Sequence, residues 1–172
     1  MKKAGEFYKV SNEQYMEACV NFFGSDCSKK EAYNTIKLPT RATVGSAGYD
    51  FFAPFDFSLN PGEEITVPTG IRAKIEEGYV LMIFPRSGLG FKYRLTLNNT
   101  VGIIDSDYYM SDNEGHIMIR LTNCSETKSL EIKAGSGFAQ GLFVPFGITY
   151  SDNADGIRNG GFGSTTKNKK QP

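Results

Sequence analysis

Two aspartates near the middle of the chain, Asp105 and Asp107, stand two residues apart and come just before Tyr108. On an extended segment such residues face the same side, so the two carboxylates would lie together beside the aromatic ring. One carboxylate could act as a general base, and the ring could pack against a sugar or a base. The alternative is an Asp-rich turn next to a packed tyrosine, which needs no ligand.

A second candidate is the segment at 85–90, PRSGLG, which directly follows the apolar run at 79–84. Arginine supplies planar, permanently charged donors for a phosphate, serine adds a hydroxyl, and glycines let backbone N–H groups approach an anion. A turn with a surface arginine would have the same sequence. Taken alone, the segment indicates an anion site but is not specific for one.

Two glycine-rich segments follow. The segment at 135–140 lacks the Lys-Ser/Thr ending of a P-loop and precedes no predicted helix, so it is a weak nucleotide fingerprint. The segment at 160–166 combines glycines, one aromatic ring and three hydroxyls, as a flap that closes over a nucleotide would need. A disordered tail is the alternative. His116 is the only histidine, which excludes a His-based triad or a multi-histidine metal site, and we expect it to be an ordinary strand residue.

Short apolar or alternating runs, separated by turns, indicate the elements that position these residues. The runs lie at 65–67, 71–75, 79–84, 116–121, 130–132 and 142–144, and they predict an all-β sandwich or small barrel. Before them, Ser11 and Gln14 resemble a capping box, and one-face spacing up to Gly24 predicts a helix, with a second short helix from Ser28. We therefore expect a helical N-terminal extension at 1–35, a β-domain at 36–150 and a flexible arm at 151–172.

Composition narrows the class of protein. The 172 residues suit one domain, and 19 Lys and Arg against 19 Asp and Glu leave no surplus charge for coating nucleic acid or an anionic membrane. The N-terminus lacks the apolar run of a signal peptide, and no stretch approaches the roughly 18 apolar residues of a membrane span. We expect a soluble, cytoplasmic protein that binds neither nucleic acid nor membrane.

The order of the motifs is more informative than any one of them. Five segments resemble, in order, the five motifs of the trimeric deoxyuridine triphosphatases (dUTPases), over about residues 36–166. These segments are Ser46–Asp50, Pro85–Leu89, Gly102–Tyr108, Gly137–Gln140, and Arg158 with Gly160–Thr165.

The resemblance implies an all-β jelly-roll, or distorted β-barrel, that works as a homotrimer with active sites shared between three chains. It implies hydrolysis of dUTP to dUMP and pyrophosphate, which lowers dUTP and supplies dUMP for thymidylate synthesis. Mg²⁺ would be held mainly through the substrate triphosphate.

The resemblance also implies a role for each motif residue. Asp105 would be the general base, Tyr108 would pack against the deoxyribose, and Asp50 would orient Mg²⁺-bound water. The uracil edge would be read by Asn99, Gly102 and Ile103, and the phosphates bound by Arg86, Ser87, Gly88 and Gln140. The arm would close over the substrate with Arg158, Phe162, Gly163, Ser164 and Thr165, and Phe162 would stack on uracil.

Three departures from the family pattern stand out. Gly137 replaces a residue that is usually basic, residues 110–114 lengthen the connection after the catalytic segment, and one residue fewer than usual separates Arg158 from Gly160. Two other functions remain as alternatives. One is deamination of dCTP, and the other is a regulatory module that contacts a protein through residues 1–33 and 112–114.

Overall fold

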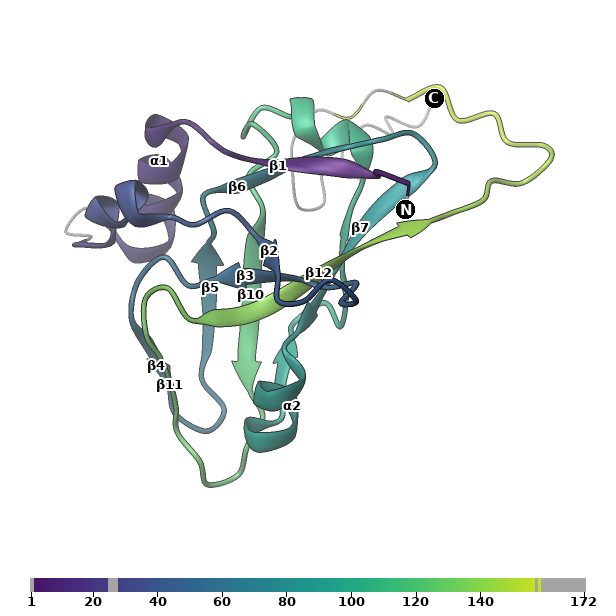
Figure 1. Cartoon of the computed structure of the whole chain (residues 1–172). Coiled ribbons are helices and arrows are strands. Elements are labelled where there is room, and N and C mark those ends of the chain that lie inside the picture. Colours follow the sequence, from purple (N-terminus) through teal and green to yellow (C-terminus); the bar gives the residue numbers. More distant parts are fainter. Residues whose placement is uncertain (1, 25–27, 157, 159–172) are drawn as a thin grey trace, which may run out of the picture.

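The computed structural model describes residues 2–24, 28–156 and 158, and it is mostly β. Within these residues, twelve strands form four antiparallel sheets that together enclose one apolar core (Figure 1). The strands are β1 (Gly5–Lys9), β2 (Thr40–Arg41), β3 (Tyr49–Phe52), β4 (Phe57–Leu59), β5 (Glu64–Pro68), β6 (Ile71–Ile75), β7 (Tyr79–Pro85), β8 (Leu95–Leu97), β9 (Gly102–Ile104), β10 (Met118–Asn123), β11 (Leu130–Ile132) and β12 (Gly137–Pro145).

The largest sheet has the order β2-β3-β12-β7-β9. Its centre is the long pairing of β12 with β7, in which Ala139 lies opposite Pro85 and Pro145 lies opposite Tyr79. Smaller sheets, β5-β10-β8, β1-β6 and β11-β4, complete the barrel. Alternate residues of each strand point inward, so Leu81, Ile83 and Phe138 are at most 1% exposed. The all-β class that the apolar runs predict is confirmed, and the fold is consistent with the jelly-roll barrel that the resemblance implies.

The six predicted apolar runs all belong to strands, namely β5, β6, β7, β10, β11 and β12. His116 is not itself in a strand, because β10 begins two residues later, and its side chain is fully buried. The glycine-rich segment at 135–140 was expected to be a loop, but most of it belongs to a strand. Gly137 already belongs to β12, and the register shifts between Gly137 and Ala139, as at a β-bulge.

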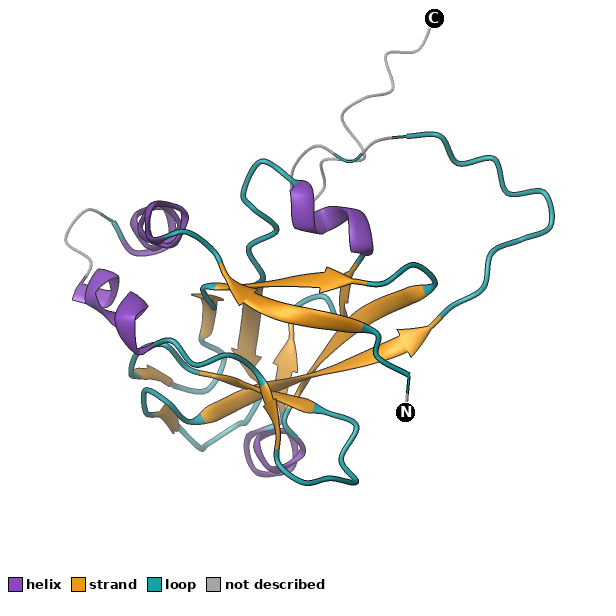
Figure 2. Cartoon of the chain, turned by 45° about the horizontal axis from the view of Figure 1, so that its top comes forward, coloured by secondary structure: helices purple, strands orange, loops and turns teal. Residues whose placement is uncertain are grey.

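The N-terminal extension is only partly helical. Residues Gly5–Lys9 form β1, which pairs with β6 along its whole length, so the prediction of a purely helical segment at 1–35 is wrong there. The reason is that Phe7 points into the core and adds to a cluster of aromatic rings. The helices α1 (Asn12–Phe23) and η1 (Ser28–Thr35) follow, and they cover one side of the barrel (Figure 2).

Two further short helices lie next to the predicted site residues. α2 (Ser87–Tyr93) begins inside the PRSGLG segment, and the 3-10 helix η2 (Ser106–Met110) begins directly after Asp105. The expectation that Asp105 and Asp107 lie on one extended segment is therefore wrong, since only Asp105 is extended. α2 and η2 lie at opposite ends of the barrel (Figures 1 and 2). Among the described residues, no helix is both long and apolar enough to cross a bilayer.

Candidate active site

Asp50, Arg86 and Gln140 meet at one corner of the five-stranded sheet. The register places Gln140 between Asp50 on β3 and Phe84 on β7. Arg86 follows β7, and its Nε lies 3.2 Å from Asp50 Oδ1 in an ion pair, while Gln140 Nε2 donates to the Pro85 carbonyl at 3.3 Å. We call these three residues, with Ser87 and Gly88, the arginine cluster. It joins a fixed cation and amide donors to one carboxylate, as an anion or metal-phosphate site requires.

Gly137 gives the arginine cluster its shape. A Cβ built on Gly137 would lie 2.8 Å from Arg86 Nη1, and Arg86 Nη1 donates to the Gly137 carbonyl at 3.3 Å. Arg86 therefore occupies the space that a side chain at position 137 would need. Arg86 therefore supplies a cation beside Gly137, where the fourth motif has no basic side chain of its own.

Ser87 and Gly88 open α2, with Arg86 as the N-cap residue. The first backbone N–H groups of a helix have no partner within the helix, so this turn presents donors beside the Arg86 side chain. The Arg86 carbonyl accepts from Leu89 N and Gly90 N, at 3.1 and 3.0 Å, which fixes the turn. The segment at 85–90, for which a turn with a surface arginine was the alternative, thus contains the start of a helix.

Asn99, Gly102 and Ile103 lie along the edge of the same sheet. Asn99 is exposed in the turn before β9, where Thr100 adopts a left-handed conformation with φ of 67°. Gly102 is buried opposite Ile83, and a Cβ on Gly102 would lie 3.1 Å from Ile83 Cβ. Ile103 is half exposed on the outer edge. An edge strand has free backbone donors and acceptors, which could read the edge of a base.

A second cluster lies where β9 ends. Arg158 Nη2 lies 2.5 Å from Asp105 Oδ2, and Arg158 Nε lies 3.2 Å from Asp107 Oδ1. The Arg158 guanidinium also lies 5.8 Å from the centre of the Tyr108 ring. We call these four residues the aspartate cluster. η2 and the arm thus bring both carboxylates to one cation, although the two aspartates do not share an extended strand.

The Tyr108 side chain is buried and held at its hydroxyl. The hydroxyl donates to the His116 carbonyl at 2.8 Å and accepts from Asn113 Nδ2 at 2.8 Å. Burial raises the pKa of Tyr108, against the opposing effects of the Asn113 hydrogen bond and the Arg158 charge. The phenol therefore stays neutral at ordinary pH. Its ring is a rigid apolar surface, which we call the Tyr108 wall.

The two clusters are far apart in one chain. Ile104, next to Asp105, lies opposite Leu81, whereas Arg86 comes five residues after Leu81. At about 3.3 Å per residue this is about 17 Å along the strand. Asp50 lies three strands to the side of β9, or about 14 Å at the usual strand spacing. A single chain does not bring Asp105 and Asp50 to one reacting centre.

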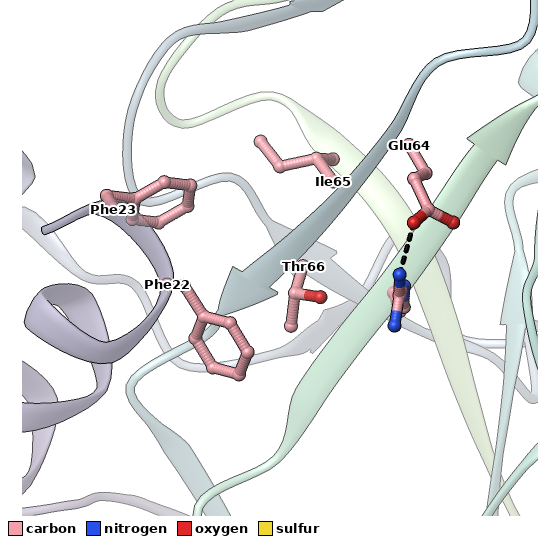
Figure 3. A pocket seen from close by; sticks show the side chains of 6 residues that line it. Phe22, Phe23, Glu64, Ile65 and Thr66 are labelled. Atoms are coloured by element: carbon pink, nitrogen blue, oxygen red, sulfur yellow. Dashed lines mark hydrogen bonds and ion pairs between the residues drawn. The ribbon is translucent and has the colours of Figure 1, made fainter.

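One hollow on the surface contains none of the predicted site residues. Figure 3 shows Phe22 and Phe23, at the end of α1, facing Ile65 and Thr66 of β5, and Glu64 and Arg120 complete the lining. Glu64 and Arg120 are paired with each other. The hollow lacks the free cation or carboxylate that phosphate chemistry would need.

The structure adds residues that sequence reasoning missed. Asn113, Glu114 and His116 all lie in the connection after η2. Asn113 and His116 bind the Tyr108 hydroxyl, and Glu114 binds Ser11, which is remote in the sequence. Of the predicted residues, Phe162, Gly163, Ser164 and Thr165 lie outside the described part of the chain. In that described part, no group of three or more His, Cys, Asp and Glu side chains could hold a metal ion.

Comparison with known proteins identifies the family. The dUTPase family model matches residues 34–166. The deoxyuridine 5'-triphosphate nucleotidohydrolase of Lactococcus lactis is 41% identical over 133 residues, which cover 76% of this chain and 88% of the relative. That of Paraburkholderia phytofirmans is 41% identical over 139 residues, covering 76% and 90%.

Solved structures give the same result. A crystal structure of dUTPase from Streptococcus mutans is 32% identical, with a TM-score of 0.61, and covers 83% of this chain and 97% of that one. A Staphylococcus bacteriophage 80alpha dUTPase variant with dUpNHpp is 20% identical, with a TM-score of 0.62 over 92% of this chain and 100% of its own, and shares the fold.

Fold and motifs together define an enzyme of nucleotide hydrolysis built on a jelly-roll barrel. The chain belongs to the dUTPase family.

Proposed function

We propose that the chain hydrolyses dUTP to dUMP and pyrophosphate in a homotrimer whose active sites combine clusters from different copies. The observation that carries this proposal is the separation of the arginine cluster from the aspartate cluster. The arginine cluster offers phosphate-binding groups and the aspartate cluster offers the carboxylate of a general base. Within one chain, however, the two clusters lie at opposite corners of the five-stranded sheet. A second copy is the simplest source of the missing half.

The segment after β12 supports an assembly. Phe146, Ile148 and Tyr150 are 52%, 74% and 113% exposed, and they stand at alternate positions of a segment that leaves the barrel (Figure 1). Exposed apolar side chains in a row mark a surface that another protein covers. We expect this part of the arm to lie on a neighbouring copy, so that its end closes a site which the other two chains form.

Asp105 is the proposed general base. Its carboxylate would accept a proton from a water molecule as the water oxygen bonds to the α-phosphorus of dUTP. The bond between that phosphorus and the oxygen bridging to the β-phosphate breaks, and pyrophosphate leaves with the electron pair. Such a reaction depends mainly on positioning and on neutralising charge. Arg86, Gln140 and the N–H groups of Ser87 and Gly88 would do this at the phosphates.

Mg²⁺ fits the donors of the arginine cluster. Mg²⁺ in nucleotide sites is commonly held by one or two carboxylates, waters and the substrate phosphates, and it neutralises phosphate charge when bound. Asp50 is the one carboxylate of this cluster, with a side chain that is 19% exposed and fixed by Arg86. It would orient a metal-bound water rather than form a complete protein cage.

The uridine half of the substrate would be recognised along β9. Asn99 and the backbone at Gly102 and Ile103 would bind the uracil edge. Tyr108 would form the wall against the deoxyribose, and a fixed wall leaves no space for a 2′-hydroxyl. From the arm, Phe162 would stack on uracil, and Arg158, Gly163, Ser164 and Thr165 would close over the phosphates. In the cell, this reaction would lower dUTP and supply dUMP for thymidylate synthesis, in the cytoplasm.

The experiment that tests this function supplies the protein with dUTP or dCTP and Mg²⁺, and measures pyrophosphate and ammonia separately. We expect pyrophosphate and dUMP from dUTP, no ammonia from dCTP, and loss of turnover when Mg²⁺ is chelated. Ammonia from dCTP would instead establish the deaminase alternative. Size-exclusion chromatography with light scattering should give a mass of three chains, and a stable monomer with full activity would overturn the shared site.

A further inference from the structure

The connection between η2 and β10 folds back onto the Tyr108 segment. Glu114 and Gly115 both adopt left-handed conformations, with φ of 57° and 69°. A Cβ on Gly115 would lie 2.7 Å from the Tyr108 carbonyl oxygen, so only glycine fits there. The left-handed Glu114 is less usual, because a residue with a Cβ pays for this conformation. Other contacts of Glu114 must therefore offset the free-energy cost of this backbone conformation.

The Glu114 carboxylate is bound at the start of α1. Glu114 Oε2 accepts from the backbone N of Ser11 at 2.8 Å, and Glu114 Oε1 accepts from the Ser11 hydroxyl at 2.6 Å. Ser11 is the N-cap residue, and its Oγ accepts from Gln14 N at 3.1 Å. In an ordinary capping box the residue at Gln14 would also bind the N-cap N–H. Here Glu114, which is 103 residues away, takes that place.

A second link runs from Glu114 to η2. Arg72 Nη1 lies 3.9 Å from Glu114 Oε2, and Arg72 Nη2 donates to the Tyr109 carbonyl. The Arg72 guanidinium lies 3.7 Å from the centre of the Tyr109 ring, which also contacts Tyr8 of β1. Burial would raise the pKa of Glu114, but the two Ser11 hydrogen bonds and the charge of Arg72 outweigh this and hold it below its ordinary value. The carboxylate is therefore charged at neutral pH.

The same connection also holds the side chain of Tyr108, which lies in η2. Asn113 and His116, on either side of the Glu114–Gly115 turn, make the two hydrogen bonds to the Tyr108 hydroxyl. The position of that turn thus sets the position of the ring. α1 fixes the turn from outside, since Ser11 binds Glu114 and Tyr15 packs near His116, with ring centres 6.3 Å apart.

We propose that Glu114 is a positioning residue, which ties the start of α1 and Arg72 to the turn that holds the Tyr108 wall. The inference rests on the proposed function, because it assigns a consequence for the substrate: the tie keeps the wall close enough to exclude a 2′-hydroxyl. The helix α1 then acts on substrate selection indirectly, through the contacts of Ser11 and Tyr15 with this turn.

The test compares Glu114→Gln with wild type in kcat/KM for dUTP and for UTP. Gln keeps the shape but loses the charge and one acceptor. We expect the ratio of the two values to fall roughly tenfold, within the range of about a hundredfold that a 1 Å misplacement can cost. The ratio does not depend on the fraction of active protein, so a merely structural role, which lowers the melting temperature, would leave it unchanged.

Two further variants complete the test. Ser11→Ala removes one of the hydrogen bonds to Glu114 and should lower the ratio less, while Glu126→Gln, an exposed glutamate away from the clusters, should leave it unchanged. Hydrogen exchange at 105–116 should quicken in Glu114→Gln and Ser11→Ala only. Wild-type protein without dUTP turnover would overturn the proposed function. An active wild type with an unchanged ratio in Glu114→Gln would overturn the role of Glu114, whatever the exchange shows.

Discussion

Arg158 and Asp105, 53 residues apart in the sequence, form an ion pair in which Arg158 Nη2 lies 2.5 Å from Asp105 Oδ2. The same guanidinium reaches Asp107, so Arg158 pairs with both carboxylates. A carboxylate oxygen bound to a guanidinium is not free to take a proton from water. Only Oδ2 of Asp105 is held in this way, so under the proposed function the other carboxylate oxygen could accept the proton, and Arg158 would release Oδ2 when it binds the substrate phosphates.

Replacing Arg158 by alanine should lower kcat/KM for dUTP about ten- to a hundredfold, because a hydrogen bond to a charged group contributes roughly 1.5–3 kcal/mol. The melting temperature should stay nearly unchanged, since partly exposed ion pairs contribute little to stability. Arg158→Lys should lie between, as an ammonium cannot span two acceptors in the fixed geometry of a guanidinium. Steady-state kinetics at saturating Mg²⁺ measure this, and wild-type kinetics in Arg158→Ala would remove it from the site.

Mixing two inactive variants should restore activity if sites are shared. Asp105→Asn chains keep the arginine cluster, and Arg86→Ala chains keep the aspartate cluster. Each variant alone should lose at least a hundredfold in kcat, while Asp105→Asn should still bind a non-hydrolysable dUTP analogue. In mixed trimers, some interfaces combine the two intact clusters. After the variants are unfolded and refolded together, we expect a substantial part of wild-type activity, and mixtures as inactive as their components would contradict sharing.

Deleting residues 160–172 should abolish most of the activity without unfolding the barrel. The last strand, β12, ends at Pro145, so the core is complete well before the deletion begins. The removed residues include those proposed to stack on uracil and to close over phosphate. Circular dichroism and thermal unfolding should match wild type while kcat/KM falls. Unchanged kinetics would refute the closing arm.

His116 should make stability depend on pH. Its Nε2 accepts from Gly70 N at 2.8 Å, so the neutral ring carries its proton on Nδ1, which has no partner among the described residues. Burial lowers the pKa of His116 to about 4 from 6.5, and the nearby Glu114 charge opposes this only in part. The unfolded chain therefore binds a proton between pH 6.5 and 4 that the folded chain does not.

The stabilisation is complete above pH 6.5 and is lost as the pH falls toward 4, by up to roughly 3 kcal/mol over that range. Urea unfolding at fixed protein concentration, at pH 7 and pH 5, measures it. His116→Gln keeps an acceptor for Gly70 N but does not titrate, so its stability should change less between these two values. An equal change in both proteins would show that other groups cause it.

Much of the barrel could be predicted because local patterns mark it. β6, with buried Ile71, Ala73 and Ile75 alternating with outward Arg72 and Lys74, is a clear strand in the sequence. β1 was missed because it has one buried residue, Phe7, among charged neighbours, and it is a strand only because β6 is there to pair with it. Pairing across the fold is not visible in a short window.

The residues of the site also divide into those that local sequence patterns identify and those that only the folded structure reveals. Asp105, Arg86 and Gln140 could be selected because their segments match ordered motifs. Glu114 could not, because its partner Ser11 is remote in sequence and its own neighbours suggest only a polar loop. The position of Arg86 beside Gly137 was equally hidden, since it depends on the pairing of β7 with β12, in which Pro85 lies opposite Ala139.

The segment between Val10 and Ile36, which contains α1 and η1, begins and ends beside the same residue of the barrel, Gly70. Val10 N donates to the Gly70 carbonyl at 3.0 Å, and Ile36 packs so closely on Gly70 that a Cβ there would lie 2.3 Å from Ile36 Cδ1. The stretch between these two ends is nevertheless part of the core, because Tyr15 and Cys19 of α1 are fully buried in it. A shorter bridge between Val10 and Ile36 would therefore uncover the barrel beneath α1 and would also remove the Glu114 contact to Ser11.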